Sequence, residues 1–313
     1  MQQRRAAKRA LQTARYIVDT HAIKNLLVIP VTPWILSAAL SLHKSCPQLN
    51  MILFVMDDWQ GHHECHHLPY SKGRRRLLTE AVVRANVRFA VSREMAAYYE
   101  SVYGNSWQVA HNGVSRDSIH QTVGHSDRKK QVLLAGDINE FRFDAVLSFA
   151  EAINRHNGRN GNPIDLVVMG DVAEKHRRPL SRIDAVRFLG RQAHRTCLNA
   201  MQEADLLYLP LAFNKTATRI SRYSLPTKLP EYLATGKEVL FHAPVESALF
   251  QVAERYDLEP RVSSTDPAAL DAFIESWQGG TEEFETRLLK ARTALLQEFD
   301  IDVLSRTFQA SFN

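Results

Sequence analysis

Cysteine is scarce in this 313-residue chain, and no Cys-x-x-Cys pair is present. The three cysteines are Cys46, Cys65 and Cys197. A small, odd number of widely spaced cysteines argues against a disulfide framework and favours reduced thiols in a cytosolic setting. The chain also has no internal repeat beyond the similarity of its two halves and no low-complexity segment, so we expect an ordinary globular protein.

We expect no ordinary secretion signal, because the basic start is not followed closely by an apolar core and a small-residue cleavage site. One stretch, Asn25 to Leu42, lacks Lys, Arg, Asp, Glu and His. Its length is near the minimum for a membrane span, but Pro30 and Pro33 interrupt it. We interpret it as a buried strand, Asn25–Ile29, that leads into a helix; a spanning segment is the alternative.

The composition indicates a soluble α/β protein long enough for two domains, with 45% apolar and 23% charged residues. The net charge of +5 is unevenly distributed, with one basic cluster at residues 4–15 and a second at residues 72–76. Such clusters suit anionic lipid head groups or phosphorylated substrates. We expect an anionic membrane surface at the basic N-terminus and no nucleic-acid partner; solvated helix faces are the alternative.

Strand-like runs alternate with helical patterns along the chain. In the first part the strand-like runs are Asn25–Ile29, Met51–Val55, Val87–Val91 and Trp107–Ala110. After a polar segment from His111 to Arg128, the alternation restarts with runs at 131–135, 164–169, 186–189, 205–210 and 238–242. Alternation of this kind predicts parallel sheets with right-handed crossovers. We therefore predict two doubly wound α/β domains.

The segment Ser221 to Gly236 is followed directly by an apolar run and predicts a short helix. Pro226 suits the first turn, because its missing N–H would have no partner there. Gly236 suits a left-handed end of the helix. Backbone N–H groups near the start, together with Lys228, would stabilise a diphosphate, and Glu231 is one turn further on, within reach of a ribose diol. An ordinary surface helix is the alternative.

Six motifs in order carry a resemblance to a known family. They are Val-Ala-His-Asn-Gly-Val (109–114), Val-Leu-Leu-Ala-Gly-Asp (132–137), Leu-Val-Val-Met-Gly (166–170), Val-Arg-Phe-Leu-Gly (186–190), Ala-Asp-Leu-Leu-Tyr-Leu-Pro (204–210) and Ser-Leu-Pro-Thr-Lys-Leu-Pro-Glu-Tyr-Leu-Ala-Thr-Gly-Lys (224–237). Together they resemble glycosyltransferases of the GT-B fold, in particular the large retaining family numbered four.

The resemblance implies two Rossmann-like domains and a division of the chain into three parts. Residues 1–120 would form an acceptor-side domain, and residues 129–280 a domain that binds the nucleotide sugar. Residues 281–313 would form helices that pack back on the first domain. The family usually opens with further strands and a Gly-rich loop, which are missing here, so we expect a shortened first domain.

The resemblance also implies glycosyl transfer from a UDP- or GDP-linked sugar to a hydroxyl, with retained anomeric configuration and no metal or other cofactor. A glycan or lipid-linked acceptor and a cytoplasmic setting, peripheral at the inner membrane face, would follow. The implied catalytic residues are Lys228, Arg142, Asp58 and His62. The implied donor-binding residues are Gly136, Gly190, Arg222, Ser224, Leu225, Thr227, Lys228 and Glu231.

Two positions depart from the family pattern. Asp137 stands where the family commonly has the first residue of a basic pair, and Arg219, Arg222 and Lys228 would compensate for it. Tyr223 stands eight residues before Glu231, where the family has another glutamate. A relative that binds a nucleotide sugar without turnover is therefore a second hypothesis.

A third hypothesis is a metal hydrolase. The segment His63-Glu64-Cys65-His66-His67 fits the pattern in which two histidines one helical turn apart bind zinc and a glutamate activates water. Its setting between Gly61 and Pro69 leaves barely two helical turns. Under the glycosyltransferase hypothesis, Met56-Asp57-Asp58-Trp59 follows a strand and faces the interdomain cleft, and His62 or His63 would contact the transferred sugar or the acceptor; a solvated loop histidine is the alternative.

Overall fold

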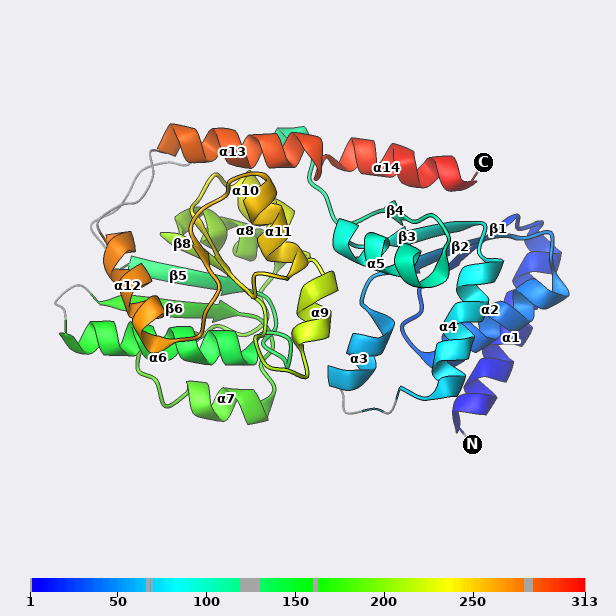
Figure 1. Cartoon of the computed structure of the whole chain (residues 1–313), viewed down its shortest axis with the longest axis horizontal. Helices are drawn as coiled ribbons and strands as arrows, with labels where there is room; N and C mark the ends of the chain where they lie inside the picture. Colours follow the sequence, from blue (N-terminus) through cyan, green and yellow to red (C-terminus); the bar gives the residue numbers. More distant parts are fainter. Residues whose placement is uncertain are drawn as a thin grey trace. The chain divides into compact units, whose positions relative to one another are not determined.

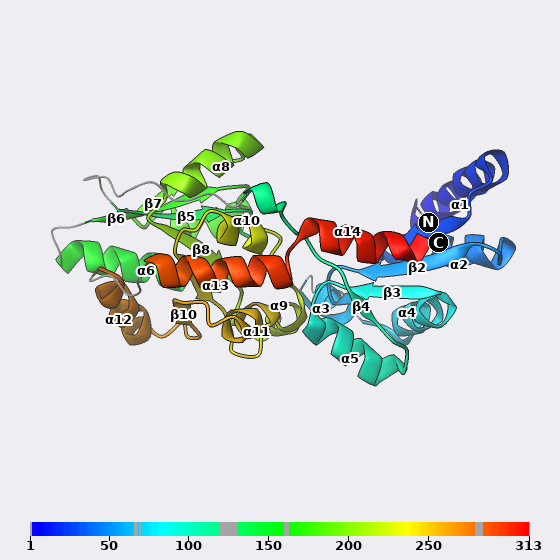
Figure 2. The same cartoon turned by 90° about the horizontal axis from the view of Figure 1, so that it is seen from above.

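The computed structural model describes residues 2–65, 68, 70–118, 130–159, 163–278 and 284–312. The chain divides into two compact units. The first comprises Met1–His111 with Val303–Asn313, and the second comprises Asn112–Asp302. Each unit contains a parallel β-sheet with helices (Figures 1 and 2), so the predicted α/β class with two Rossmann-like domains is confirmed.

The described strands of the first unit form a parallel sheet in the order β1-β2-β3-β4. Each new strand is added on the same edge, so these strands wind in one direction. The elements are α1 (Gln2–His21), β1 (Asn25–Val28), α2 (Pro33–Ser45), β2 (Asn50–Val55), α3 (Trp59–Cys65), α4 (Lys72–Arg84), β3 (Val87–Ala90), α5 (Arg93–Tyr103) and β4 (Gln108–Val109). Figure 1 shows α2, α4 and α5 on one side of this sheet.

Local sequence signals explain where the helices of this unit end. The Ser92 hydroxyl accepts a hydrogen bond from the Met95 N–H at 3.0 Å and caps α5, as predicted. Gly104 closes the same helix at φ 70°, a left-handed conformation that favours glycine. Ser71 caps α4 through the Arg74 N–H in the same way.

The other side of the first sheet is covered by the C-terminal elements α14 (Ile301–Gln309) and η2 (Ala310–Phe312), as both views of the molecule show (Figures 1 and 2). The Phe308 ring lies 5.0 Å from that of Phe89 on β3 and 6.1 Å from that of Phe54 on β2, between ring centroids. The last segment of the described chain therefore completes the core of the first unit.

Side-chain amides fix this C-terminal segment at the amino ends of the first two strands. Asn50 donates from Nδ2 to the backbone oxygen of Ser311 and to Oδ1 of Asn25, both at 2.7 Å. Asn25 in turn donates to the backbone oxygen of Phe312 at 3.2 Å. Paired amides satisfy buried polar groups that would otherwise oppose this packing.

The second unit contains a six-stranded parallel sheet in the order β10-β9-β8-β5-β6-β7, as far as the described residues show. Its elements are η1 (Arg116–Ser118), β5 (Lys130–Ala135), α6 (Phe143–Arg159), β6 (Ile164–Met169), α7 (Glu174–Leu180), β7 (Val186–Phe188), α8 (His194–Glu203), β8 (Leu206–Pro210), α9 (Thr218–Tyr223), α10 (Leu229–Ala234), β9 (Val239–His242), α11 (Ala248–Arg255), β10 (Arg261–Val262), α12 (Pro267–Gln278) and α13 (Phe284–Gln297). The chain runs outward from β5 to β7, returns, and continues on the other side from β8. This is the doubly wound order, with its switch point between β5 and β8.

A continuous apolar core stabilises the second sheet. Helices α6 and α12 pack against each other and contribute to one buried cluster with the central strands. Within it, the rings of Phe149 on α6 and Tyr208 on β8 lie 4.6 Å apart. The core thereby holds β5 and β8 side by side with their carboxyl ends at one edge, where parallel sheets bind ligands.

The C-terminal helices differ from the prediction that residues 281–313 pack as a whole on the first domain. Helix α13 packs against α10 in the second unit, and only the chain from Val303 groups with the first unit. The reason is the apolar stripe of α13, whose Leu288, Ala291 and Leu295 side chains are buried. Residues 119–129, which include most of the predicted linker, lie outside the described residues.

The segment Asn25 to Leu42 forms β1 and most of α2. Leu36 and Leu40 on this helix are buried in the first unit. Among the described residues, no helix is long and apolar enough to cross a membrane.

We predict that replacing Phe308 with alanine destabilises the first unit by about 2–4 kcal/mol, because it removes a ring that packs against Phe54 and Phe89. The measurement is native-state hydrogen exchange of β2 and β3 amides. The matched control is Gln309→Ala on the exposed side of the same helix, expected to change stability by less than about 0.5 kcal/mol. Equal exchange in the two variants would show that α14 contributes nothing to this core.

Candidate functional site

The loops after β5 and β6 touch through their backbones at the carboxyl edge of the second sheet. A Cβ added to Gly170 would lie 2.3 Å from the backbone oxygen of Gly136, so only glycine fits there. The Gly136 N–H donates to the Met169 oxygen at 2.8 Å, and the Ile138 N–H donates to the Asp171 oxygen at 3.0 Å. The two strands thus continue to pair beyond their ends and hold Gly136 in a fixed position.

Arg142 lies against Gly136. A Cβ on Gly136 would be 2.5 Å from Nη1 of Arg142, and the residue has φ +154°, which glycine tolerates. Nη1 of Arg142 also donates to the Asp137 backbone oxygen at 3.3 Å. Burial lowers the pKa of this guanidinium, and the neighbouring Tyr232 and Asp137 oppose that shift. The structure therefore brings two of the predicted site residues, Gly136 and Arg142, together beside the switch point.

Tyr232 joins helix α10 to this edge of the sheet. Its hydroxyl accepts a hydrogen bond from the Ala135 N–H at 2.7 Å, at the last residue of β5. Burial raises the pKa of this phenol far above its ordinary value, so it stays neutral. Tyr232 was not predicted from the sequence. The signal that could have indicated it is an aromatic side chain with a polar hydroxyl on the buried face of this helix.

The helix that carries Lys228 and Glu231 is shorter than predicted. It begins at Leu229 rather than at Pro226, because residues 226–229 form a turn in which the Leu229 N–H donates to the Pro226 oxygen at 3.1 Å. Its end agrees with the prediction, since Gly236 follows at φ 67°. The Ser224 N–H donates to the Ile220 oxygen at 2.8 Å, so this amide is already used in the structure.

Lys228 and Glu231 form an ion pair one turn apart, with Nζ and Oε2 separated by 2.7 Å. Each side chain is 25% exposed. At this exposure an ion pair contributes about 0–1 kcal/mol, so a ligand can exchange it at low cost. The pair places a cation and a carboxylate side by side on the helix that Tyr232 fixes to β5.

The segment before this helix forms a second short helix, α9. The Ser221 hydroxyl donates to the Ala212 oxygen at 2.8 Å and attaches this helix to the loop after β8. Of the other predicted residues here, Ser224 and Leu225 are buried, whereas Thr227 is exposed. Arg222 lies 4.0 Å from Glu246, and the guanidinium of Arg219 lies over the Tyr223 ring.

The loop after β7 reaches the same edge. Gly190 adopts φ 67°, and the next residue, Arg191, places Nη2 2.9 Å from Asp171 Oδ2 and 4.0 Å from Asp137 Oδ2. The loops after β5, β6 and β7 therefore converge, and Arg191 supplies a cation beside Asp137. The sequence reasoning missed this role of Arg191.

Asp144 on α6 holds the loop after β8. Its Oδ2 accepts hydrogen bonds from the N–H groups of Phe213 at 2.9 Å and Asn214 at 2.7 Å. A carboxylate that accepts two backbone N–H groups is a strong positional restraint. Since α6 follows β5, this contact ties the two sides of the switch point together.

A buried hydrogen-bonded chain lies behind this edge. The Tyr208 hydroxyl lies 2.8 Å from Nδ1 of His242, and Nε2 of His242 lies 2.9 Å from the Ser264 oxygen. Burial lowers the pKa of His242 to about 4, so the ring is neutral near pH 7. A neutral ring donates from Nε2 to Ser264, and the Tyr208 hydroxyl beside Nδ1 also donates to the Ala145 backbone oxygen at 3.0 Å.

In the first unit, the carboxylate of Asp58 is fully buried and caps helix α3. It accepts hydrogen bonds from the Gly61 N–H at 2.7 Å and from the Tyr99 hydroxyl at 3.0 Å. Burial, with a further contribution from Asp58, raises the pKa of Tyr99 well above its ordinary value. These contacts give Asp58 a structural role, and its catalytic role stays a prediction, as does that of the partly exposed His62.

Of the two histidines proposed to bind zinc, the structure describes only His63. His63 is buried, and its Nδ1 lies 2.6 Å from the backbone oxygen of Trp59. His67, the second proposed ligand, lies outside the described residues, as does His66. Among the residues that the structure describes, no group of three His, Cys, Asp or Glu side chains is arranged to hold a metal ion.

No family model matches this chain, and no curated protein matches it significantly in sequence. Many solved structures match it in fold. Sucrose-phosphate synthase from Thermosynechococcus elongatus superposes with a TM-score of 0.71 and 12% identity, over 96% of this chain and 75% of that one. An α,α-trehalose-phosphate synthase (UDP-forming) from Burkholderia vietnamiensis gives 0.69 and 14%, over 99% and 76%.

HepE from Anabaena, in complex with UDP, gives a TM-score of 0.66 and 16% identity, over 97% of this chain and 81% of that one. A further structure of that protein contains UDP and glucose. At these identities the likeness shows the fold alone. This chain has the GT-B fold of two Rossmann-like domains.

We predict that Gly170→Ala destabilises the second unit by about 1–3 kcal/mol, because the new methyl group would displace the Gly136 backbone. The measurement is hydrogen exchange of the β5 and β6 amides with urea unfolding. Gly158→Ala is the matched control: its Cβ would meet no atom within 4 Å, and alanine favours the helix by up to about 1 kcal/mol. Unchanged stability in Gly170→Ala would contradict the close approach.

We predict that His242 makes the second unit less stable as the pH falls from about 6.5 to about 4. The native state holds the ring neutral to about pH 4, whereas the unfolded chain binds a proton near pH 6.5, so unfolding takes up a proton within this window. The loss approaches about 3 kcal/mol. Urea unfolding of the parent and His242→Gln at pH 7 and pH 4.5 measures it, and equal pH slopes would refute the assignment.

Proposed function

We propose that this protein is a glycosyltransferase that transfers a sugar from a nucleotide diphosphate sugar to a hydroxyl acceptor. The observation that carries the proposal is the arrangement at the switch point of the second sheet. There the Arg142 guanidinium lies against the Gly136 backbone, and the Tyr232 hydroxyl fixes the helix that follows Lys228 and carries Glu231 to the last residue of β5. The fold supports the proposal, since the similar structures include enzymes of sugar-phosphate synthesis and a protein in complex with UDP.

Transfer of a sugar from a nucleotide diphosphate is favoured by cations beside the leaving diphosphate. Transfer breaks the bond between the anomeric carbon and the diphosphate oxygen and forms a bond from that carbon to the acceptor oxygen, whose hydroxyl proton passes to the departing diphosphate. Negative charge then develops on the diphosphate, and positioned cations stabilise it most where water is partly excluded. Arg142, which is partly buried against the Gly136 backbone, and Lys228 fit this role.

Glu231 fits the binding of the nucleotide ribose. In the structure it is paired with Lys228, and a diphosphate would draw that ammonium away and leave the carboxylate to accept hydrogen bonds from the ribose diol. The exchange replaces one ion pair with another, so its cost is small. Arg191, Arg222 and Arg219 bring further positive charge to the same unit and compensate for Asp137.

The finer parts of the proposal follow the resemblance of the sequence motifs. They are a UDP- or GDP-linked donor, retention of anomeric configuration without a metal ion, and an acceptor in glycan or lipid-linked oligosaccharide assembly. A cytoplasmic protein working at the inner membrane face agrees with the exposed basic residues at the start of α4, which are Lys72, Arg75 and Arg76. These side chains suit anionic lipid head groups.

The competing function is binding of a nucleotide sugar without turnover. Tyr223 favours it, because this buried side chain stands where the family has a glutamate that contacts the transferred sugar. The structural use of both Asp58 oxygens favours it as well. The two functions share the donor site and differ only in product formation.

We predict that UDP or GDP, or a sugar conjugate of one, raises the melting temperature of the full chain, and that Lys228→Ala and Glu231→Ala each reduce the rise. A ligand at a hundred times its dissociation constant stabilises the native state by about 2.7 kcal/mol, enough for a visible shift. The measurement is thermal unfolding against UDP, GDP, ADP, CMP and their common sugar conjugates.

Lys44→Ala serves as the charge-matched control, since Lys44 is exposed on α2 in the first unit. We expect this variant to have the melting temperature of the parent and the same rise in melting temperature with nucleotide. The stabilising nucleotide sugar is then tested for transfer, with the anomeric configuration of the product read by NMR. Binding without product would select the non-catalytic function, and the absence of any nucleotide effect would refute both.

A further inference from the structure

Three exposed apolar side chains lie at the carboxyl edge of the first sheet. Val31 comes shortly after β1, Met56 follows β2 directly, and Leu68 lies between α3 and the start of α4. Their exposed fractions are 59%, 36% and 46%. The Leu68 N–H donates to the His63 oxygen at 2.8 Å, which attaches this residue to α3. Because loops that follow parallel strands share one edge of a sheet, three separate segments bring apolar surface to the same end of the unit.

Helices α1 and α4 begin at this edge. Helix α1 ends shortly before β1 starts, and α4 ends shortly before β3 starts, so the ends of both helices lie at the amino edge of the sheet and their starts lie away from it. Both helices pack against α2, and Figure 1 shows their starts at the same end of the unit. The basic clusters of the sequence, which fall in the first half of α1 and at the start of α4, are therefore on the side of the exposed apolar side chains.

The exposed cations of these helix starts have no ion-pair partner in the protein. Lys72, Arg75 and Arg76 on α4 and Arg9 on α1 are exposed, and none of them pairs with a carboxylate of the described residues. Asp57, an exposed carboxylate at the same edge, already interacts with another residue. The four positive charges are therefore available to a partner.

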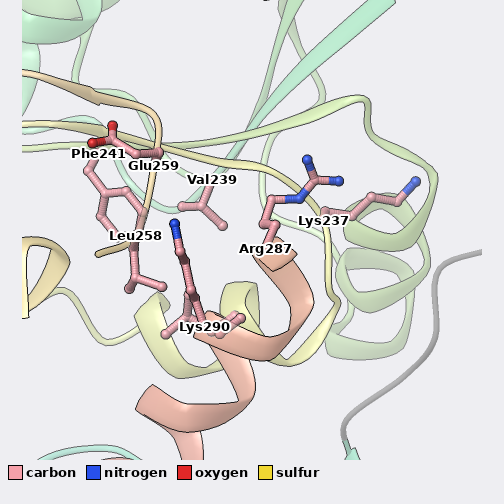
Figure 3. A pocket seen from close by; sticks show the side chains of 9 residues that line it. Lys237, Val239, Phe241, Leu258, Glu259, Arg287 and Lys290 are labelled. Atoms are coloured by element: carbon pink, nitrogen blue, oxygen red, sulfur yellow. The ribbon is translucent and has the colours of Figure 1, made fainter. Parts of the chain in front are cut away.

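A basic hollow in the second unit does not offer such charges. Figure 3 shows Lys237, Arg287 and Lys290 around it, beneath α13. Nζ of Lys290 pairs with Oδ2 of Asp257 at 2.7 Å, and Lys237 and Arg287 also interact with other residues of the protein. These cations are used within the unit, so the hollow supports no ligand.

Charge and apolar exposure together select the partner of the carboxyl edge. A second copy of the chain would bring four unpaired cations against four more, and like charges repel. A soluble polyanion would match the cations but leave the three apolar side chains in water. An anionic bilayer satisfies both, because its head groups attract Lys and Arg and its interfacial region accepts apolar side chains.

We propose that the three apolar side chains and the four unpaired cations form a docking surface for an anionic lipid bilayer. The cations contact the lipid head groups, and the apolar side chains enter the interfacial region. The inference deepens the membrane setting of the proposed function and rests on it. Ligands of parallel sheets bind at the carboxyl edge, so docking at this edge would present the acceptor-side loops to a lipid-linked acceptor.

The test is co-sedimentation of the full chain with vesicles of phosphatidylcholine alone and of phosphatidylcholine mixed with phosphatidylglycerol. We expect binding to the mixed vesicles only, and weaker binding as salt is added, because salt screens exposed charges. Failure to bind the mixed vesicles at low salt would overturn the proposal, as would equal binding to the neutral vesicles.

Two charge-matched variants locate the contact. The docking variant combines Lys72→Gln, Arg75→Gln and Arg76→Gln. The control variant removes the same charge from exposed positions of this unit outside the docking surface, namely Arg15→Gln, Lys24→Gln and Lys44→Gln. We expect the docking variant to bind the mixed vesicles at least about ten-fold more weakly and the control variant to bind like the parent. Equal weakening in both would show attraction by net charge alone and refute the surface.

An apolar variant separates a bilayer from the other partners. Leu68→Ser is expected to weaken vesicle binding by at least about five-fold, whereas Val83→Ser, exposed near the other end of α4, is expected to bind like the parent. Unchanged binding of Leu68→Ser would overturn the bilayer in favour of a soluble polyanion. A dimer of the chain alone that Leu68→Ser dissociates would assign the surface to a second copy.

The rise in melting temperature with nucleotide is measured on the parent and on the docking variant, and we expect it to be equal in both. A parent that responds to nucleotide but does not bind vesicles would refute the docking surface and leave the proposed transfer intact. A parent that binds vesicles through this surface but does not respond to nucleotide would refute the transfer and leave the docking surface intact. Circular dichroism checks that each variant is folded.

Discussion

The candidate site depends on the backbone contact between Gly136 and Gly170, where two parallel strands continue to pair beyond the sheet. Any side chain at Gly170 would occupy the space of the Gly136 carbonyl. Because the two loops are in contact, Gly136 presents its bare backbone, and Arg142 packs directly against it. Without this contact the loops would separate, and the guanidinium would lose the surface that positions it.

A second constraint brings the α10 helix to this surface. The Tyr232 hydroxyl meets the last amide of β5, so a helix of only six residues is anchored by one buried hydrogen bond as well as by its apolar face. The consequence is that Glu231 on this helix, and Lys228 directly before it, are held in a fixed position relative to the end of β5, where they form their ion pair.

The core of the first unit is completed by the C-terminal helix α14. Its described strands are added in one direction, and the side of the sheet opposite α2, α4 and α5 is covered by α14, through Phe308 and Phe312. Its polar residues near the predicted active site are used for structure: Asp58 caps α3 and holds the Tyr99 hydroxyl. Both oxygens of the Asp58 carboxylate are thus used in contacts that hold the first unit together.

The sequence by itself determined the alternation of strands and helices, the caps at Ser92, Gly104 and Gly236, and the identity of the residues placed near the switch point, because these depend on local spacing and backbone preference. The tertiary structure determined features that the spacing of residues along the chain does not encode. Pro226 begins a turn and not the helix, Tyr232 anchors α10, and Arg191 meets Asp137. Helix α13 joins the second unit because its apolar stripe is buried there. The roles of Tyr232, Arg191 and α13 arise from contacts between residues far apart in the chain, and these contacts form only when the strands lie side by side.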